Sequence, residues 1–266
     1  MSQEVLLEKI DGVAWITLNR PAARNALTLA MCTDLARIIE QLQDDAATRV
    51  IVLRANGTDF TVGADLKDMS QTLSPSAATR AQEIPAIARE ISWPIFLGLH
   101  RLKQPVVASV RGHVIGAGAQ LLLSADLCVA SETTRVLIPQ VRLAHPVDHG
   151  ESYSLPRKVG AVRAMQLLLL AEPVAAQDAE KYGLVNWVVP DAALESKTLE
   201  VVQRIASAAP VAIAQTKALV RQSPDNTIIE QFAAEARALG VCAGTEDFPE
   251  AINAFVQKRS PVFKGR

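Results

Sequence analysis

Four ionisable side chains gather in one short stretch, where His145, Asp148, His149 and Glu151 fall within seven residues. Imidazole and carboxylate groups at this spacing can act as a general base, or as a nucleophile with a helper group. A polar surface loop has the same composition, so the chemistry depends on where the fold places the stretch. The spacing matches no familiar set of metal ligands, and we predict no metal site.

Two glycine-rich stretches, Gly57 to Leu66 and Arg111 to Gln120, each lie between a predicted strand and a predicted helix. Such turns present backbone N–H groups at the positive end of a helix. We expect the N–H group of Ala117 to belong to an oxyanion hole. Two converging donors would stabilise a thioester carbonyl as it becomes an enolate or a tetrahedral oxyanion. Close packing of a helix against a strand is the alternative interpretation.

Two other motifs are incomplete. The dinucleotide-binding pattern fails because Leu121 occupies its third glycine position and Asp126 comes too soon to be the ribose-binding acid. The stretch Gly150 to Ser154 is close to the nucleophile elbow of serine hydrolases, but it lacks the last glycine and no strand precedes it. A nucleotide-dependent oxidoreductase is therefore the weakest candidate, and a serine hydrolase is disfavoured.

The composition excludes several classes of protein. The chain has 266 residues, 27 Lys and Arg against 28 Asp and Glu, a net charge of −1 and only 4% aromatic residues, which argues against nucleic-acid binding. No apolar run reaches the roughly 18 to 20 residues that span a bilayer. The N-terminus shows no signal-peptide pattern. Cys32, Cys128 and Cys242 are odd in number and far apart, as in a reduced, cytoplasmic protein.

Elements that must position these residues alternate between strand and helix over the first three quarters of the chain. The predicted strands are 5–9, 13–18, 50–53, 105–110, 127–130, 136–138 and 185–189, the first two joined by a hairpin turn at Asp11-Gly12. Helices are predicted at 28–43, 64–69, 79–102 with interruptions near Pro85 and Pro94, 117–124, 154–171 and 175–182, and then at 194–208, 211–221, 228–243 and 248–258. We predict an α/β core over residues 1–194, which carries the active site, and a helical region over 195–266.

Several motifs occur along the chain in an order that resembles the enoyl-CoA hydratase/isomerase (crotonase) superfamily. They are Ile16 to Pro21, Arg24 to Leu27, Phe60 to Leu66, Gly112 to Leu121, Pro139, Gly160, Ala175 to Val189 and Ala254 to Arg259. The resemblance implies a spiral of ββα units with C-terminal helices that pack subunits into a homotrimer or a dimer of trimers. It also implies an acyl-CoA thioester substrate and no cofactor other than the coenzyme A of that substrate.

By motif position, the resemblance implies an oxyanion hole made by the N–H groups of Ala64 and Ala117. Coenzyme A would lie beside Arg24, at the pantetheine and phosphates, and Lys258, at the nucleotide end. The loop that includes Val62, Asp65, Leu66 and Lys67 would contact it as well. Family members often have alanine where this chain has Val62. Solvated surface charge is the alternative interpretation for Arg24, Lys67 and Lys258.

The glutamates that serve hydratases of this family as acid and base are replaced here by Gln120 and Gln140. An amide cannot act as a general base near neutral pH, although it can hold a water or a carbonyl by hydrogen bonds. We therefore expect both glutamines to line the pocket and to orient substrate or water. Hydration by a glutamate pair does not transfer to this chain.

Asp148 occupies the position of the nucleophilic aspartate of the aryl-CoA dehalogenase branch, and Ser152 to Leu155 also resemble that branch. That branch has tryptophan where this chain has Gln140. Burial beside an acyl pocket would raise the pKa of Asp148. We predict that Asp148 is the base or nucleophile, with His145 as its helper, in an isomerase, hydrolase or dehalogenase. The alternative is a non-catalytic CoA-thioester-binding or assembly protein.

Overall fold

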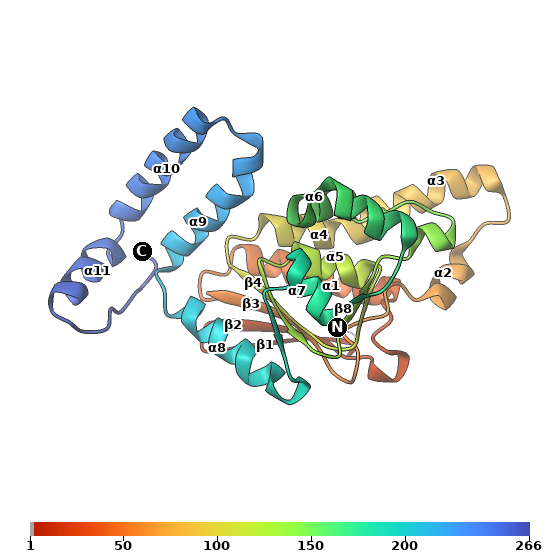
Figure 1. Cartoon of the computed structure of the whole chain (residues 1–266), viewed down its shortest axis with the longest axis horizontal. Coiled ribbons are helices and arrows are strands. Elements are labelled where there is room, and N and C mark those ends of the chain that lie inside the picture. Colours follow the sequence, from red (N-terminus) through yellow and green to blue (C-terminus); the bar gives the residue numbers. More distant parts are fainter. Residues whose placement is uncertain (1–2) are drawn as a thin grey trace.

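Two β-sheets form the centre of the structure, a computed structural model that describes residues 3–266 (Figure 1). The larger sheet contains β1 (Val5–Ile10), β2 (Val13–Leu18), β3 (Val50–Ala55), β4 (Val106–Val110), β6 (Leu127–Ser131) and β9 (Trp187–Val189), in that spatial order. Within this larger sheet, β1 and β2 pair antiparallel and the other neighbouring strands pair parallel. The smaller sheet contains β5 (His113–Ile115), β7 (Arg135–Leu137) and β8 (Val174–Ala175).

Alternate residues of the larger sheet enter two separate cores, because successive side chains of a strand point to opposite faces. One face, with residues such as Ile16 and Leu53, packs under α1 (Leu29–Gln43), α4 (Trp93–Arg101) and α5 (Ala117–Ser124). The opposite face is covered by α8 (Leu194–Ala206). The second core consists of Val13, Val50, Val52, Val107, Val129, Leu194, Val201 and Val202. The predicted boundary at 194/195 therefore falls at the start of a helix that completes the packing of the sheet.

Local sequence signals explain the first elements well. The β1–β2 turn has positive φ at Asp11 and Gly12, as a tight hairpin requires. Thr28 begins α1 by accepting a hydrogen bond from the N–H of Met31 at 3.2 Å. The predicted apolar stripe of this helix is buried, with Leu35, Ile38, Ile39 and Leu42 each at most 1% exposed. The predicted hairpin and the helix predicted over 28–43 are both confirmed.

The helix predicted over 79–102 is interrupted in a different way from that expected. After α2 (Leu66–Thr72), α3 (Ala77–Ile87) continues through Pro85, and a π-helical turn over Ala88–Ser92 leads directly into α4. Pro94 has no N–H group, and its ring would clash with the carbonyl of Glu90 in a regular helix. The wider turn, in which the Trp93 N–H bonds the Ala88 carbonyl, relieves that clash.

The second half of the core contains α6 (Glu151–Leu170), which is kinked at Gly160, and α7 (Ala176–Tyr182). Helix α6 begins three residues earlier than predicted. The predicted strand 185–189 is shorter in the structure, where β9 begins at Trp187. Val185 is buried but lies before the strand. Strand β5 was not predicted because its three residues are too few to show a period of two.

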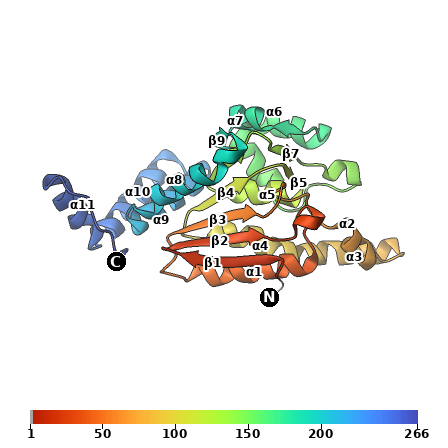
Figure 2. The same ribbon diagram turned by 90° about the horizontal axis from the view of Figure 1, so that it is seen from below.

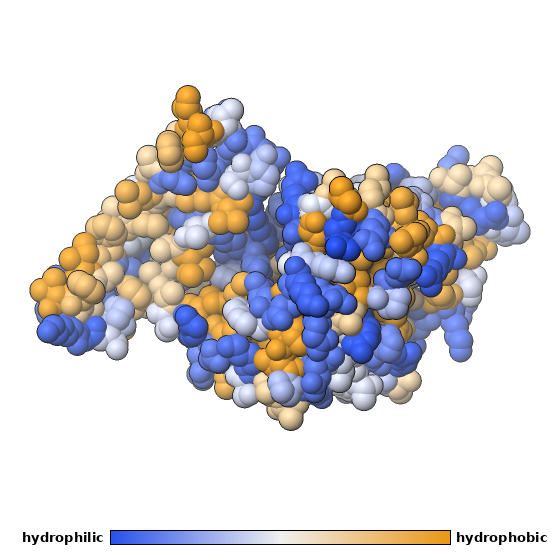
Figure 3. Space-filling model, in the orientation of Figure 1, coloured by the Kyte–Doolittle hydropathy of each residue, from blue (hydrophilic) through white to orange (hydrophobic). Residues whose placement is uncertain are grey.

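The C-terminal helices α9 (Pro210–Gln222), α10 (Ile228–Ala243) and α11 (Asp247–Val256) project away from the sheets (Figures 1 and 2). No strand occurs after β9 within the described residues, as predicted. Many apolar side chains are exposed on this region (Figure 3), among them Ile229, Phe232 and Phe255. Within residues 3–266, no helix combines the length and the apolar character needed to cross a bilayer.

Candidate active site

The two glycine-rich turns lie side by side. The Thr61 N–H donates to the His113 carbonyl at 3.0 Å, and the Ile115 N–H donates to the Thr61 carbonyl at 3.0 Å. A Cβ atom on Gly63 would lie 2.8 Å from the Ile115 carbonyl oxygen, so no larger residue fits between the turns. Strand β5 therefore brings together two segments that are more than 50 residues apart in the sequence.

Both turns leave one backbone donor free at the cavity described below. Ala64 and Ala117 each follow a glycine with positive φ, 88° at Gly63 and 56° at Gly116. Within the part of the chain that the structure describes, neither alanine N–H group donates a hydrogen bond. Ala117 is also the first residue of α5, where the helix dipole favours negative charge. Two such donors can stabilise the oxygen of a thioester as charge develops on it.

A cavity of about 330 Å³ lies beside these donors. Its walls come from the start of α1, the two turns, α2, and the continuous helix from α3 to α4. Apolar side chains, including Val62, Leu66, Ile87 and Phe96, make up most of the lining. The polar side chains of the lining are Asp68, Ser92, Gln140, Arg142, His145, Asp148 and His149. The cavity can therefore hold an apolar acyl group beside a small number of polar groups.

Helix α4 holds the loop that carries Asp148. The indole Nε1 of Trp93 donates to the Asp148 carbonyl at 3.0 Å, and the Phe96 ring packs against the His149 ring with centroids 5.2 Å apart. The Nδ1 atom of His149 lies 3.2 Å from Oδ1 of Asp148. The predicted helper, His145, lines the cavity, but its Nδ1 donates to the Pro146 carbonyl at 2.9 Å. His149 is therefore the imidazole in ion-pair contact with Asp148.

Glu151 belongs to the ionisable stretch noted in the sequence, but the sequence indicated no role for it in the site. It is completely buried at the start of α6. Its Oε1 accepts a hydrogen bond from Nε2 of Gln140 at 2.7 Å, and its Oε2 accepts one from the His149 N–H at 3.0 Å. Nδ1 of His149 lies 3.6 Å from Oε1. In the sequence, the one indication of a role for Glu151 is its place near Asp148 and His149. Composition alone does not show that its side chain is buried.

Burial and charge act in opposite directions on these three groups. Burial raises the pKa of Asp148, and the opposing effect of His149 does not cancel it. Burial also acts on His149, but Glu151 and Asp148 outweigh it and raise the pKa of the imidazole. For Glu151, burial is outweighed by the contacts with His149, which hold its pKa below the usual value. Glu151 is therefore a fixed anion, whereas Asp148 retains its proton more readily than an ordinary aspartate.

The same three residues have ligand atoms within 4.8 Å of one another, a spacing compatible with a metal ion. Glu151 already accepts two hydrogen bonds, and Nδ1 of His149 lies between two carboxylates. Ion pairing and hydrogen bonding therefore account for the arrangement.

The two glutamines at the hydratase positions lie in different places. Gln140 is on the cavity wall, with its Nε2 bonded to Glu151. Gln120 is not part of the lining; its Nε2 donates to Oγ of Ser124 and Oγ of Ser154, both at 3.2 Å. The structure therefore brings Gln140, but not Gln120, to the cavity.

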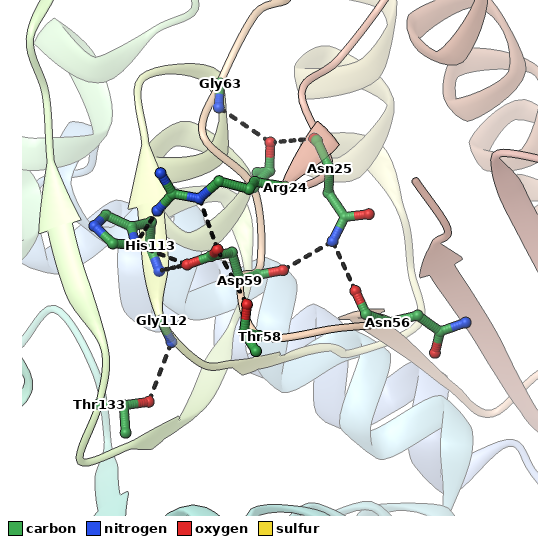
Figure 4. Close-up of polar contacts among 10 residues, drawn as sticks. Arg24, Asn25, Asn56, Thr58, Asp59, Gly63, Gly112, His113 and Thr133 are labelled. Carbon is green, nitrogen blue, oxygen red and sulfur yellow. Dashed lines mark hydrogen bonds and ion pairs between the residues drawn. The ribbon is translucent and has the colours of Figure 1, made fainter. Parts of the chain in front are cut away.

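Arg24 belongs to a cluster at the edge of the glycine-rich turns (Figure 4). Its Nε donates to Oδ2 of Asp59 at 2.9 Å, and its Nη2 lies 2.6 Å from Nδ1 of His113, which is also 2.7 Å from Oδ1 of Asp59. Burial of Asp59 is outweighed by these bonds, which hold its pKa well below the usual value. The guanidinium is half exposed and held in place, as an anion-binding residue should be.

The other residues expected near coenzyme A have more varied positions. Asp65 begins α2 by accepting bonds from the N–H groups of Lys67 and Asp68, and it pairs with Arg20 at 2.7 Å. Lys67 is exposed beside it. Lys258 follows α11, at the opposite end of the molecule from α2 and α3 (Figures 1 and 2). The structure therefore does not bring Lys258 to the cavity of its own chain.

Comparisons with known proteins match almost the whole chain. A family model described as enoyl-CoA hydratase/isomerase matches residues 8–266. The 2,3-dehydroadipyl-CoA hydratase of Escherichia coli (strain K12) is 33% identical over 263 residues, 99% of each chain. A trans-2-decenoyl-acyl-carrier-protein isomerase of Streptococcus mutans is 32% identical over 264 residues, again 99% of each chain. The crystal structure of an enoyl-CoA hydratase from Bacillus anthracis has a TM-score of 0.90 at 30% identity, and the match covers 99% of this chain and 100% of that chain.

Proposed function

Because the chain belongs to the enoyl-CoA hydratase/isomerase family, we propose that it is an isomerase of enoyl thioesters in which Asp148 transfers the proton. The chain is an enzyme of the acyl-CoA class with the crotonase fold of two sheets and C-terminal helices. The observation that carries the proposal is that Asp148 lines the same apolar cavity as Ala64 and Ala117. A base and two oxyanion donors then face one substrate.

The proposed reaction needs no group beyond these. The thioester oxygen of a 3-enoyl-CoA accepts hydrogen bonds from the N–H groups of Ala64 and Ala117. The Asp148 carboxylate removes a proton from C2, and the negative charge of the dienolate moves to the oxygen. The protonated Asp148 then delivers the proton to C4, so that the C2–H bond breaks, a C4–H bond forms and the double bond moves to C2=C3. The raised pKa of Asp148 suits a group that must both accept and return a proton.

Water addition is disfavoured by the residues at the hydratase positions. Gln120 and Gln140 cannot exchange protons with water, and Gln120 does not line the cavity. An isomerase needs only one acid–base residue, and a relative with 32% identity is named as an isomerase. Asp148 as a nucleophile toward an aryl-CoA is the second candidate, supported by its place on the cavity wall.

Arg24, Val62, Leu66 and Lys67 are proposed to contact the coenzyme A part of the substrate, with Arg24 pairing with its phosphates. The exposed apolar surface of α10 and α11 is proposed to pack against further copies of this chain in a homotrimer or a dimer of trimers. Such packing would cover side chains that are otherwise exposed to water, including Phe232 and Phe255. Lys258 can then contact a substrate only in the site of a neighbouring subunit.

The proposal is tested by incubating the enzyme in D₂O with a panel of 3-enoyl-, 2-enoyl- and halobenzoyl-CoA thioesters and following products by mass spectrometry. We expect 3-enoyl-CoA to convert to 2-enoyl-CoA, with deuterium at C4 in the fraction of turnovers in which the protonated Asp148 exchanges with solvent before it returns the proton. Asp148→Asn should lower kcat by about 10²- to 10⁴-fold, because a general base contributes that much, with KM little changed.

Asp68→Asn is the matched control. Asp68 lines the same cavity, but its Oδ2 accepts the Leu29 N–H at 2.9 Å, so it has a structural contact of its own. We expect this variant to retain turnover. Unchanged turnover in Asp148→Asn would remove Asp148 from the mechanism. Halide release would make it a nucleophile, formation of a 3-hydroxyacyl-CoA would make the enzyme a hydratase, and binding without turnover of any thioester would favour a non-catalytic protein.

A further inference from the structure

Behind Asp148, a chain of contacts leads through His149 to the buried carboxylate of Glu151. We propose that Glu151 is a positioning residue for the Asp148 base: it anchors His149, and the His149 ring in turn holds the Asp148 carboxylate at the cavity wall. This inference rests on the proposed function, because it assigns Glu151 a part in the same proton transfer. Glu151 itself does not line the cavity and does not touch the substrate.

The distances support this order of contacts. Glu151 accepts the backbone N–H of His149 at 3.0 Å with one oxygen, and its other oxygen lies 3.6 Å from Nδ1 of the same residue. That Nδ1 atom lies 3.2 Å from Oδ1 of Asp148. The Phe96 ring covers the His149 ring. The His149 imidazole thus lies between the completely buried carboxylate of Glu151 and the partly exposed carboxylate of Asp148. His149 can orient Asp148 only while Glu151 holds His149 in place.

Glu151 is itself fixed by the backbone and by Gln140. Gly150 has φ of 103°, a conformation that L side chains rarely adopt, so the turn that leads into Glu151 favours glycine. Glu151 is the first residue of α6, where the helix dipole stabilises a negative charge. Nε2 of Gln140 donates to it at 2.7 Å. A glutamate at position 140 would instead place two carboxylates in contact, so the amide and Glu151 form a matched pair.

Few other charged groups act on this chain of contacts. His145 is the further group whose charge acts on Asp148, and Asp68 and Arg142 line the same cavity from α2 and the turn after Pro139. The residues of α4 that pack against the loop, Trp93 and Phe96, are uncharged at all accessible pH values. The charge of Glu151 therefore acts mainly on His149.

The first test needs no substrate. NMR titration of the imidazole signals in the full-length protein gives the midpoint of each of its four histidines, and His149→Asn identifies the signal of that residue. We expect Glu151→Gln to lower the His149 midpoint by about one pH unit, at the small end of the effect of an opposite charge within 4–6 Å. Glu151→Asp should restore part of it. Glu230→Gln, which alters an exposed acid in the first turn of α10, should leave the His149 midpoint unchanged.

The second test is kinetic. We expect Glu151→Gln to lower kcat on the 3-enoyl-CoA substrate by about ten- to a hundredfold, less than loss of the base itself, with KM unchanged. An unchanged His149 midpoint in Glu151→Gln would overturn the proposal. If that variant does not fold, Glu151→Asp decides the question by the same titration. A shifted midpoint without isomerase activity in the unaltered enzyme would support the contact chain and refute the proposed function.

Discussion

The molecule contains two small groups of buried charges that are built differently. The cavity cluster consists of Asp148, His149 and Glu151. The anchor cluster consists of Asp126, Lys217 and Arg221, and it joins α9 to the core. Both contain three ionisable groups with mostly small exposed fractions, the largest being the 37% of the Asp148 side chain. They differ in whether every polar atom has a partner.

The anchor cluster satisfies its charges completely. Asp126 accepts Lys217 and Arg221 at 2.7 Å each, and also the Val106 N–H at 2.8 Å. Lys217 donates further to the Gln104 carbonyl, and Arg221 to the carbonyls of Leu99 and His100 at the end of α4. The cations therefore lie where the helix dipole favours them. Such a group fixes one geometry.

The cavity cluster is less complete. It has two carboxylates for one imidazole, and neither Oδ1 of Asp148 nor Nδ1 of His149 has a hydrogen bond of good geometry. Asp148 and His149 both line the cavity, whereas Asp126, Lys217 and Arg221 do not. The comparison teaches that buried charge marks chemistry only where a polar atom is left available to a substrate, since fully paired charge serves to hold structure together.

Removing the carboxylate at the centre of each cluster should separate the two roles most clearly. Asp126→Ala should lower the free energy of unfolding by about 3–5 kcal/mol, because it leaves two buried cations unpaired. Asp148→Asn should leave stability unchanged or slightly higher, because burial already disfavours its charge. Urea denaturation followed by circular dichroism measures both. Equal loss of stability in the two variants would contradict the distinction.

Adding a charge to the cavity cluster should make it resemble a strained carboxylate pair. Gln140→Glu places a second carboxylate against Glu151, and we expect a loss of about 2–3 kcal/mol at pH 8. One carboxyl pKa then lies above its unfolded value, so stability is lost as pH rises and is regained on acidification toward pH 5. Denaturation of this variant and of Gln140→Leu at both pH values measures the effect. A pH-independent difference between them would show that the carboxylates do not interact.

The smallest effect concerns the lysine of the anchor cluster. Burial lowers the pKa of Lys217 to about 8, although Asp126 opposes the shift. The unfolded chain then binds more protons between pH 8 and 10, so the contribution of Lys217 to stability rises with pH by about 1–2 kcal/mol. Comparison with Lys217→Met in denaturant titrations from pH 7.5 to 9.5 isolates this group. If the difference between the two proteins does not change with pH, the ammonium is not destabilised by burial.

The sequence was sufficient for elements that are specified locally. The apolar period of α1 predicts a helix that the structure contains, and the buried strands β3 and β4 follow from their β-branched runs. The motif order also predicted the family and the fold. These signals require only neighbours in the chain or a resemblance that spans it.

The site was less predictable because its contacts join distant segments. Asp148, Ala64 and Ala117 were expected at the site from motif positions, and the structure places all three on the lining of one cavity. The pairing of Asp148 with His149, the burial of Glu151 and the distance of Lys258 depend on how α4, α6 and the C-terminal helices pack. The π-helical turn likewise follows from the environment of Pro94 in three dimensions.

Helix α4 has a mechanical consequence for the enzyme. Trp93 at its first turn holds the Asp148 carbonyl, and the carbonyls of its last turn hold Arg221 of α9. Helix α4 has nine residues and is therefore about 13 Å long. Helix α4 therefore connects α9 of the C-terminal region to the loop that carries Asp148. The C-terminal helices and the Asp148 side of the cavity are thus joined by one helix of nine residues, so a change in how α9 packs would reach the cavity through it.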